Sequence, residues 1–200
     1  MLQCKIKVVY LRCETNKNAT QIQLACNVKP THKPTNRTRK SIKQRRMTKI
    51  LFICLGNICR SPMAETIFKH IVEQHGAEDE YMVDSAGLIG FHAGEPADER
   101  MQRHARKHGY NITHRSRPMR EYDFTDFDIV VAMDEDNVSR LNRMAPTLEA
   151  QAKIVRMTDY LTHHSADHVP DPYYGGERGF ELVIELLEDA CAELFRQTRQ

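Results

Sequence analysis

Four short apolar runs alternate with stretches of helical periodicity after residue 47, and this alternation constrains the fold most strongly. The apolar runs cover residues 49–54, 81–87, 127–134 and 152–157. Between them, apolar side chains recur at helical spacing, as at Met63, Ile67 and Ile71. Further helices are predicted over residues 98–108, 138–144 and 180–194. Strands that alternate with helices predict a parallel sheet. We therefore expect an α/β domain: a small, doubly wound, four-stranded parallel sheet with helices on both faces and a ligand site at the carboxyl ends of the strands.

The charge of the chain changes sign near Met47. Residues 1–46 contain 12 Lys and Arg residues and one acid, Glu14, whereas residues 47–200 contain 17 basic and 26 acidic residues. The stretch 29–46 is basic and nearly free of apolar side chains, so it cannot bury enough surface to offset its ordering entropy. We expect residues 1–46 to be a basic, disordered extension, suited to nucleic acid or an anionic membrane, or else upstream sequence translated from a mis-assigned start. Residues 47–200 form the expected domain.

The cysteine content and the hydropathy indicate a reducing cytoplasm. Six cysteines are scattered along the chain, which is too few for a disulfide framework. Charged residues break the apolar run that follows Met1, so no secretory signal is expected. No run of about 18 apolar residues occurs, and no membrane span is expected.

The stretch CLGNICRS, residues 54–61, lies where the first predicted strand passes into the first predicted helix. A tight loop containing Gly56 can point backbone N–H groups inward, and the helix that follows adds its own free N–H groups. Arg60 offers a planar fork for two phosphate oxygens. The same groups would stabilise Cys54 as a thiolate that can attack phosphorus, while Ser61 donates a hydrogen bond to its sulfur. The loop therefore predicts a phosphate-binding site with a cysteine nucleophile.

Other loop chemistries fit this stretch less well. It lacks the G-x-x-x-x-G-K-[ST] pattern of ATP-binding loops, and with Gly56 as its only glycine it is not a G-x-G-x-x-G dinucleotide loop. Cys54 and Cys59 are five positions apart and no second ligand pair follows, which disfavours a structural metal site. We expect neither a metal nor another cofactor.

The motif ILFICLGNICRSPMAE, residues 50–65, strongly resembles the opening of the low-molecular-weight protein tyrosine phosphatases. VDSAG at 83–87, FDIVVAMDEDN at 127–137 and VPDPYYGG at 169–176 continue the resemblance, which extends over residues 47–200. It implies hydrolysis of phosphotyrosine in proteins through a phospho-cysteine intermediate. Cys54 would be the nucleophile and Arg60 the clamp for the phosphate and transition state. Asp171 would be the general acid that protonates the phenolate leaving group.

The same resemblance implies roles for further residues. Phosphate binding and support of the loop would fall to Leu55, Gly56, Asn57, Ile58, Cys59, Ser61, Ser85 and His114. A slot for an aromatic phosphoester would be walled by Phe91, Tyr173 and Tyr174. Asp134 is either a structural carboxylate beside the site or a helix N-cap. Cys59 is either a resolving thiol for an oxidised Cys54, which would make the activity redox-regulated, or a small buried packing residue.

Three alternatives stay open from the sequence. Arsenate reductases share this fold and loop but need further cysteines, and the chain has none between Cys59 and Cys191. Protein arginine phosphatases carry a small Thr at the position of Ile58, and the bulkier apolar side chain suits a tyrosine ring better. A non-enzymatic redox- or phosphate-sensing module would require a damaged set of catalytic residues. We expect a phosphotyrosine-containing protein as partner, no nucleic acid for the acidic domain, no membrane, and a monomer or weak dimer.

Overall fold

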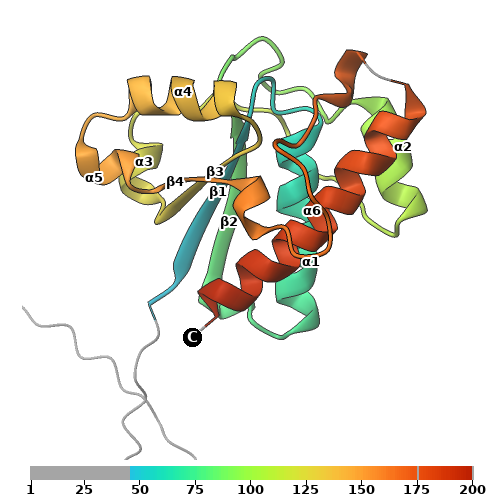
Figure 1. The fold of residues 1–200 in the computed structure, drawn as a ribbon, viewed down its shortest axis with the longest axis horizontal. Helices are drawn as coiled ribbons and strands as arrows, with labels where there is room; N and C mark the ends of the chain where they lie inside the picture. Colours follow the sequence, from blue (N-terminus) through green and yellow to red (C-terminus); the bar gives the residue numbers. More distant parts are fainter. Residues whose placement is uncertain (1–45, 175, 200) are drawn as a thin grey trace, which may run out of the picture. The chain divides into compact units, whose positions relative to one another are not determined.

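The structure is a computed structural model that describes residues 46–174 and 176–199 (Figure 1). The expectations for residues 1–45 lie outside the described residues and stay predictions. Four strands form one parallel sheet in the order β2-β1-β3-β4. Their bounds are β1 (Thr48–Cys54), β2 (Tyr81–Gly87), β3 (Ile129–Ala132) and β4 (Ile154–Arg156). The predicted four-stranded parallel sheet is confirmed.

β1 and β2 match the predicted runs to within one residue, whereas β3 and β4 are shorter than predicted. In the third run, Phe127 ends the short helix α3 (Asp123–Asp126), and Asp134 caps the start of α4 (Glu135–Met144). Phe127 and Met133 are nevertheless buried. Both ends of this apolar run therefore contribute buried side chains from positions beside helix ends, outside the sheet. Hydropathy alone does not distinguish such positions from strand positions.

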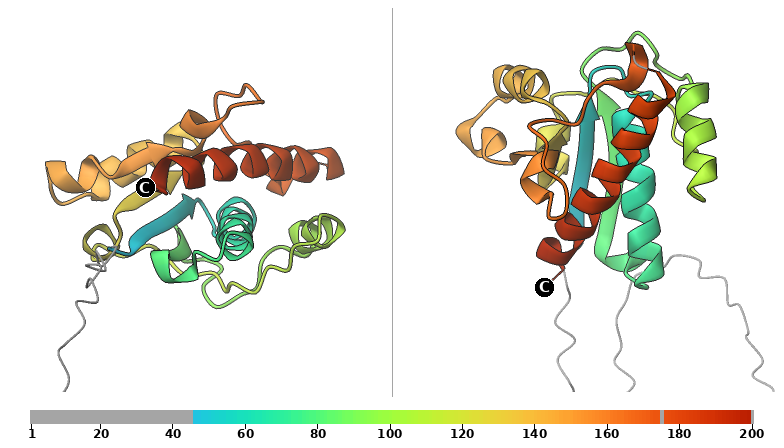
Figure 2. Two further views of the ribbon diagram at one scale, coloured as in Figure 1. Left: turned by 90° about the horizontal axis from the view of Figure 1, so that it is seen from below. Right: turned by 45° about the vertical axis from the view of Figure 1, so that its right-hand side comes forward.

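Helices cover both faces of the sheet, as predicted (Figures 1 and 2). One face packs against α1 (Arg60–Gln74) and α6 (Glu177–Thr198), and α2 (Glu99–Lys107) packs against α6. The other packs against α3, α4 and α5 (Leu148–Gln151). β1 divides these layers, because Ile50 and Phe52 point into the first and Leu51 and Ile53 into the second. All four are fully buried, and each such side chain contributes about 1.5–3 kcal/mol of hydrophobic stabilisation.

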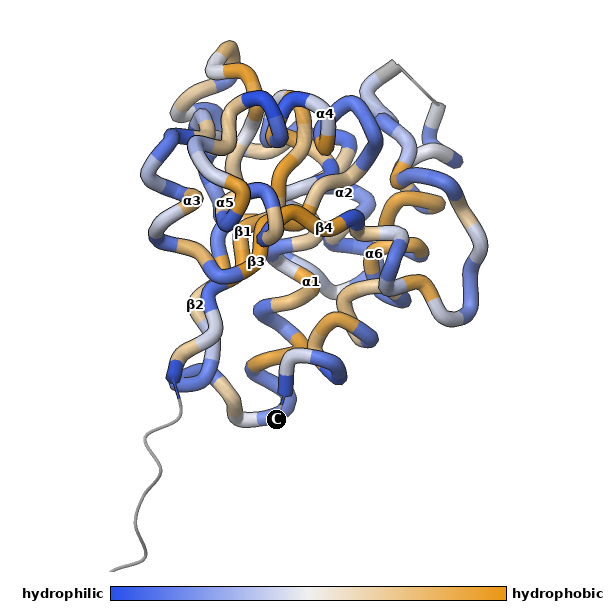
Figure 3. The backbone as a smooth tube through the Cα atoms, turned by 60° about the vertical axis from the view of Figure 1, so that its left-hand side comes forward, coloured by the Kyte–Doolittle hydropathy of each residue, from blue (hydrophilic) through white to orange (hydrophobic). Residues whose placement is uncertain are grey.

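Hydropathy along the chain follows this layering, with apolar residues concentrated in the strands of the sheet (Figure 3). Three single-turn 3-10 helices complete the described part: η1 (Glu78–Glu80), η2 (Met157–Tyr160) and η3 (Pro172–Tyr174). None of the described helices combines the length and the apolar character needed to cross a membrane.

Gly87, at the carboxyl end of β2, allows the loop after β1 to lie directly against that strand. It pairs with Cys54 in the parallel ladder. A Cβ atom at this position would lie 3.1 Å from the Asn57 Cβ, from the Gly56 carbonyl carbon and from the Ile89 oxygen. Two of these three atoms are backbone and cannot move aside easily. Glycine is therefore required here by close approach rather than by an unusual backbone angle.

A buried carboxylate on α6 fixes the segment that leads from η2 toward Asp171. One oxygen of Asp189 accepts the backbone N–H groups of Thr162, His163 and His164 at 3.1, 2.9 and 2.9 Å. The Thr162 hydroxyl donates to the other oxygen at 2.6 Å. Burial disfavours the charged carboxylate, but these hydrogen bonds outweigh it and hold the pKa of Asp189 well below its usual range. His163 and His164 thus contribute their backbone N–H groups to the contacts that fix this segment on α6.

We expect a chain that starts at Met47 to fold and to keep full activity. Among the described residues the truncation removes only Arg46, whose exposed side chain pairs with Asp128 at 2.8 Å. A surface ion pair of this kind stabilises a fold by about 0–1 kcal/mol. Urea unfolding and hydrolysis of an aryl phosphate, measured on both chains, check this. Failure of the shorter chain to fold would show that residues 1–46 belong to the domain.

Candidate active site

Cys54 is the last residue of β1, and the loop after it returns into α1 at Arg60. The cysteine is 3% exposed. Its sulfur accepts the backbone N–H of Asn57 at 3.3 Å and lies 3.0 Å from the hydroxyl oxygen of Ser61. Both groups can donate a hydrogen bond to the sulfur, which is the atom that would attack phosphorus.

The N-terminus of α1 faces this loop without a side-chain cap. Asp98, Asp134 and Thr147 cap α2, α4 and α5 through side-chain hydrogen bonds, whereas Cys59 gives α1 none, and the first turn of α1 holds no acidic residue. The N–H groups of a first helical turn need acceptors. A phosphate bound at this end of the helix would supply them.

The side-chain amide of Asn57 holds the loop in shape. The backbone of Asn57 is left-handed, with φ 56°, a conformation that Asn tolerates better than most residues. Its amide nitrogen donates to the hydroxyls of Ser61 and Ser85, both at 2.9 Å. Its amide oxygen accepts the backbone N–H of Arg117 and a ring nitrogen of His114, also at 2.9 Å. The structure therefore brings the predicted residues Asn57, Ser61, Ser85 and His114 together.

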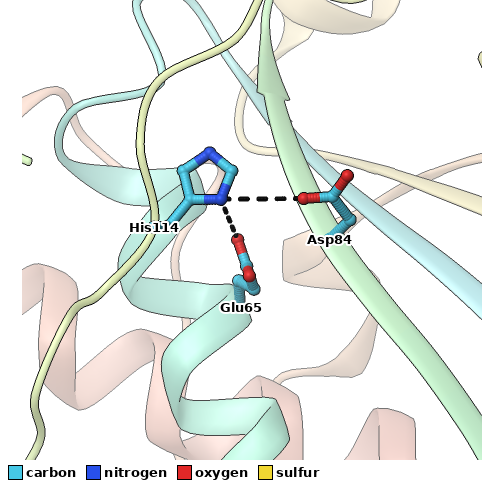
Figure 4. A group of neighbouring side chains, drawn as sticks. All are labelled: Glu65, Asp84 and His114. Atoms are coloured by element: carbon cyan, nitrogen blue, oxygen red, sulfur yellow. Dashed lines mark ion pairs between the residues drawn. The ribbon is translucent and has the colours of Figure 1, made fainter. Parts of the chain in front are cut away.

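One ring nitrogen of His114 faces Glu65 and Asp84 (Figure 4), and the other lies 2.9 Å from the Asn57 amide oxygen. The Arg117 N–H identifies the Asn57 amide oxygen as an acceptor, so the Nε2 of His114 must carry hydrogen. The Nδ1 lies 3.0 Å from Glu65 and 3.6 Å from Asp84. His114 therefore joins the Asn57 amide on one side to the Glu65 and Asp84 carboxylates on the other.

Glu65, Asp84 and His114 are also spaced as metal ligands could be, with one ligand atom of each within 4.8 Å of the others. Their charges are already balanced, because Lys69 pairs with Glu65 and Arg117 pairs with Asp84. Burial would raise the pKa of Glu65, but hydrogen bonds from His114 and Lys69 outweigh it and lower the pKa. The cluster thus satisfies its ionic groups as an ion-pair network that supports the loop.

Arg60 is buried at the edge of the phosphate loop and joins three partners. Its Nη1 donates to Asp134 at 2.5 Å and to the carbonyl oxygen of Val169 at 3.2 Å, and its Nη2 donates to Asp171 at 2.7 Å. Burial would lower the pKa of Arg60, but Cys54, Asp171 and Asp134 outweigh it and raise the pKa. Asp134 also accepts the N–H of Asn137 at the start of α4. Both sequence interpretations of Asp134 therefore hold at once.

A pocket of about 240 Å³ opens above Cys54. From the loop it is lined by Cys54, Leu55, Gly56, Ile58, Cys59 and Arg60. Three further residues named in the sequence analysis line it from outside the loop: Phe91, Asp171 and Tyr173. The Phe91 side chain is 82% exposed and packs edge-on against His92 at 5.0 Å between ring centroids. Tyr174 ends η3, and its side chain lies outside what the structure describes.

Sequence reasoning missed several residues of the site and its support. Ile89 and His92 line the pocket, while Glu65, Asp84 and Arg117 build the network around His114. Glu65 and Asp84 both stand inside the quoted motifs, so their position in those motifs was an available signal. Arg117 also donates its backbone N–H to the Asn57 amide oxygen, and the type of a residue does not indicate a backbone contact of this kind.

Cys59 is buried at the start of α1. Burial is the main cause that raises the pKa of its thiol, and the nearby charge of Asp98 adds to it. The surroundings of Cys59 therefore favour its neutral thiol form.

Comparisons with known proteins agree with this geometry. Residues 49–200 match the sequence profile of the family described as "Low molecular weight phosphotyrosine protein phosphatase". A low molecular weight protein-tyrosine-phosphatase of Streptomyces coelicolor is 41% identical over 154 residues, which cover 76% of this chain and 94% of that protein. The crystal structure of a protein tyrosine phosphatase from Entamoeba histolytica is 45% identical, covers 75% of this chain and 96% of that one, and superposes with a TM-score of 0.73. The structure of a drosophila arginine phosphatase is 34% identical, covers 76% and 99%, and gives a TM-score of 0.71.

We expect brief treatment with hydrogen peroxide to abolish activity and a thiol reductant to restore it. Peroxide would oxidise the Cys54 thiolate to a sulfenic acid, and the Cys59 thiol would condense with it, releasing water and forming a disulfide. Bound phosphate should protect the site. Because the pKa of Cys59 is raised, the condensation should become faster as the pH increases.

The variant Cys59→Ser should keep much of its activity but recover poorly after peroxide. Cys191→Ala is the matched control, because Cys191 is fully buried in the contact between α6 and α1 and should recover like the parent. Recovery is measured as the aryl phosphatase rate before oxidation, after it and after reduction. Full recovery of Cys59→Ser would make Cys59 only a packing residue.

Proposed function

The chain belongs to the low molecular weight phosphotyrosine protein phosphatase family, and we propose that Cys54, Arg60 and Asp171 carry out its hydrolysis of phosphotyrosine in proteins. The observation that carries this assignment is their shared pocket. The Cys54 sulfur lies at the end of β1, Arg60 begins α1, and Asp171 reaches the same pocket from the segment before α6. A nucleophile, a cation and a carboxyl group thus face one cavity.

In the first step the Cys54 sulfur attacks phosphorus. A sulfur–phosphorus bond forms and the bond from phosphorus to the phenolic oxygen breaks. The loop N–H groups and the Arg60 guanidinium hold the three other phosphate oxygens, where charge develops in the transition state. The departing oxygen takes a proton from Asp171, because an unprotonated phenolate is a poor leaving group.

In the second step water attacks the phospho-cysteine. Asp171, now a carboxylate, accepts a proton from that water, and the sulfur–phosphorus bond breaks to release phosphate and regenerate the thiolate. Asp171 therefore acts once as an acid and once as a base.

The ion pair between Arg60 and Asp171 belongs to the resting site. A substrate phosphate carries negative charge into contact with Arg60 and competes with Asp171 for the guanidinium. A second negative charge nearby favours the protonated form of a carboxyl group. Phosphate binding would thus both release Asp171 from Arg60 and favour the protonated acid that the first step requires.

The pocket walls suit an aromatic phosphoester. Ile58 is an apolar lining residue, and Phe91 and Tyr173 stand at the rim. A guanidinium substrate, by contrast, needs polar partners for its N–H groups. We propose that phosphotyrosine is preferred to phosphoarginine, although a drosophila arginine phosphatase shares the fold. Cys191, buried in the core and directed at the Ala64 carbonyl, does not reach the pocket as an arsenate-reducing relay would require.

The proposed setting is a reducing compartment, the cytoplasm, where the thiols persist, and the proposed partners are phosphotyrosine-containing proteins. The domain of residues 47–200 carries a net negative charge, so nucleic acid is not a proposed partner of the domain.

Rates on a phosphotyrosine peptide and on a phosphoarginine peptide of the same sequence test the proposed preference. The parent chain should favour phosphotyrosine, and Ile58→Thr should shift the ratio of kcat/KM values toward phosphoarginine. Cys54→Ser is the control, because it should bind inorganic phosphate but turn over neither peptide. Equal rates on both peptides would refute the preference, and turnover by Cys54→Ser would remove Cys54 from its role.

The role of Asp171 is tested by the leaving group. Asp171→Asn should slow aryl phosphates with poor leaving groups by about 10²–10⁴-fold and activated ones far less. The slope of log kcat/KM against the leaving-group pKa measures this, because kcat/KM depends on the first step and not on the hydrolysis of the phospho-cysteine. An equal loss for all leaving groups would mean that Asp171 is not the acid.

A further inference from the structure

Asp171 stands on a segment that has little regular structure of its own. Between η2 and α6 the described chain contains only the single turn η3. The Asp171 carboxylate accepts the N–H of Tyr173 at 3.1 Å and also pairs with Arg60 at 2.7 Å. If phosphate displaces Asp171 from Arg60, the contact through Tyr173 is left to hold the acid over the pocket. The position of the Tyr173 backbone therefore decides where the acid lies.

Arg100, on α2, contacts the Tyr173 backbone at its carbonyl group. Its Nη1 donates to the Tyr173 carbonyl oxygen at 3.1 Å. Its guanidinium also lies 5.3 Å from the centre of the Tyr173 ring and 5.1 Å from that of Phe180 on α6. A guanidinium stacked on aromatic rings and bonded to a carbonyl is held by several contacts at once. One side chain thus joins α2, η3 and α6.

Asp98 fixes the orientation of Arg100 and ties it to the phosphate loop. The Nε and Nη2 of Arg100 donate to the two Asp98 oxygens at 3.0 and 2.8 Å, a bidentate pair. The Asp98 side chain is 12% exposed, and its hydrogen bond with Arg100 is the main cause that lowers its pKa. The Asp98 backbone N–H donates to the Ile58 carbonyl oxygen at 2.8 Å. A continuous chain of contacts therefore runs from the phosphate loop through Asp98 and Arg100 to the acid segment.

The helix that carries Arg100 is itself held to α6. His104 and His108 bond the two oxygens of Glu181 at 2.5 and 2.7 Å. The His104 ring stacks on Phe180, with centroids 5.4 Å apart and planes at 13°. Arg100 and His104 thus both pack against the Phe180 ring, so α2 is fixed relative to α6 where Arg100 contacts Tyr173.

We propose that Arg100 is a positioning residue for proton transfer: it sets the place of Asp171 relative to Cys54 by holding the Tyr173 carbonyl. This inference rests on the proposed role of Asp171 as general acid. Arg100 does not touch the reacting atoms, so its loss should affect the acid-dependent part of catalysis. A displacement of about 1 Å in a catalytic group can cost about 100-fold in rate.

The test uses Arg100→Gln, which removes the charge and the bidentate fork but keeps a polar side chain. For aryl phosphates with poor leaving groups we expect kcat/KM to fall by about 10- to 100-fold, with a much smaller loss for activated ones and little change in the inhibition constant of inorganic phosphate. Arg100→Lys should share most of this defect, because an ammonium cannot reproduce the fork. The matched control is Arg103→Gln on the same helix, which removes a 54% exposed charge that lies 3.7 Å from Glu177. That control should leave the leaving-group dependence unchanged.

A double-mutant cycle separates positioning from other roles. In the Asp171→Asn background, Arg100→Gln should cause little further loss, because the acid that it positions is absent. If Arg100→Gln lowers the rate by the same factor in both backgrounds, the proposal is overturned. If instead the loss is larger for phosphopeptides that contain more acidic residues, Arg100 is a substrate-binding residue and the proposal is also overturned. Unaltered leaving-group dependence in Arg100→Gln would also overturn it.

The cycle also separates this proposal from the function on which it rests. If Asp171→Asn slows all leaving groups equally, the role of the acid fails and the positioning role fails with it. If Asp171→Asn behaves as expected and Arg100→Gln does not, only the positioning role fails. Should Arg100→Gln not fold, as judged by circular dichroism, Asp98→Asn replaces it, since it weakens the clamp while keeping the Arg100 charge.

Discussion

The amide of Asn57 is the constraint on which the rest of the active site depends. This side chain is 1% exposed and makes four hydrogen bonds, to Ser61 on α1, to Ser85 on β2, and to His114 and Arg117 on the segment after α2. Each of these partners is itself fixed by its own element or ion pair. A buried donor or acceptor that loses its partner costs about 1–3 kcal/mol, so the four bonds act together to select one loop shape. The N–H groups that would hold phosphate are thus arranged before any ligand arrives.

The hydrogen-bond partners of Arg60 stabilise its buried positive charge. A buried guanidinium without partners would be strongly destabilising. Asp134 and the Val169 carbonyl both bond Nη1, while Asp171 bonds Nη2 alone. When a phosphate takes the place of Asp171, Arg60 keeps its other two partners and gains a new anion. In the proposed mechanism, the carboxyl group that exchanges a proton is therefore also the one whose departure leaves Arg60 with its two other partners.

Most of the fold and the residue types of the site could be predicted from the sequence, because they depend on local patterns. The apolar runs located the four strands of the described sheet, and the CLGNICRS stretch located Cys54 and Arg60, the proposed nucleophile and cation, between β1 and α1. The sequence did not indicate the contacts that bring distant polar groups together. Arg117 reaches Asn57 through its backbone N–H, which the residue type does not indicate, and the Arg100 guanidinium reaches a backbone carbonyl 73 positions away, which no local pattern indicates. The ends of β3 were overestimated because Phe127 and Asp134 serve helix termini instead of the ladder.

The separation of the Arg60 partners along the chain has a consequence for protein synthesis. Val169 and Asp171 follow Arg60 by 109 and 111 positions. Contacts of such long range form only after most of the polypeptide has been made, and domains of this size fold as a unit. A growing chain on the ribosome exposes its reactive thiol long before the carboxylate that completes the site can reach it. Catalysis by the proposed residues therefore requires a chain made at least as far as Asp171, and a chain interrupted before Val169 carries Cys54 and Arg60 without that carboxylate.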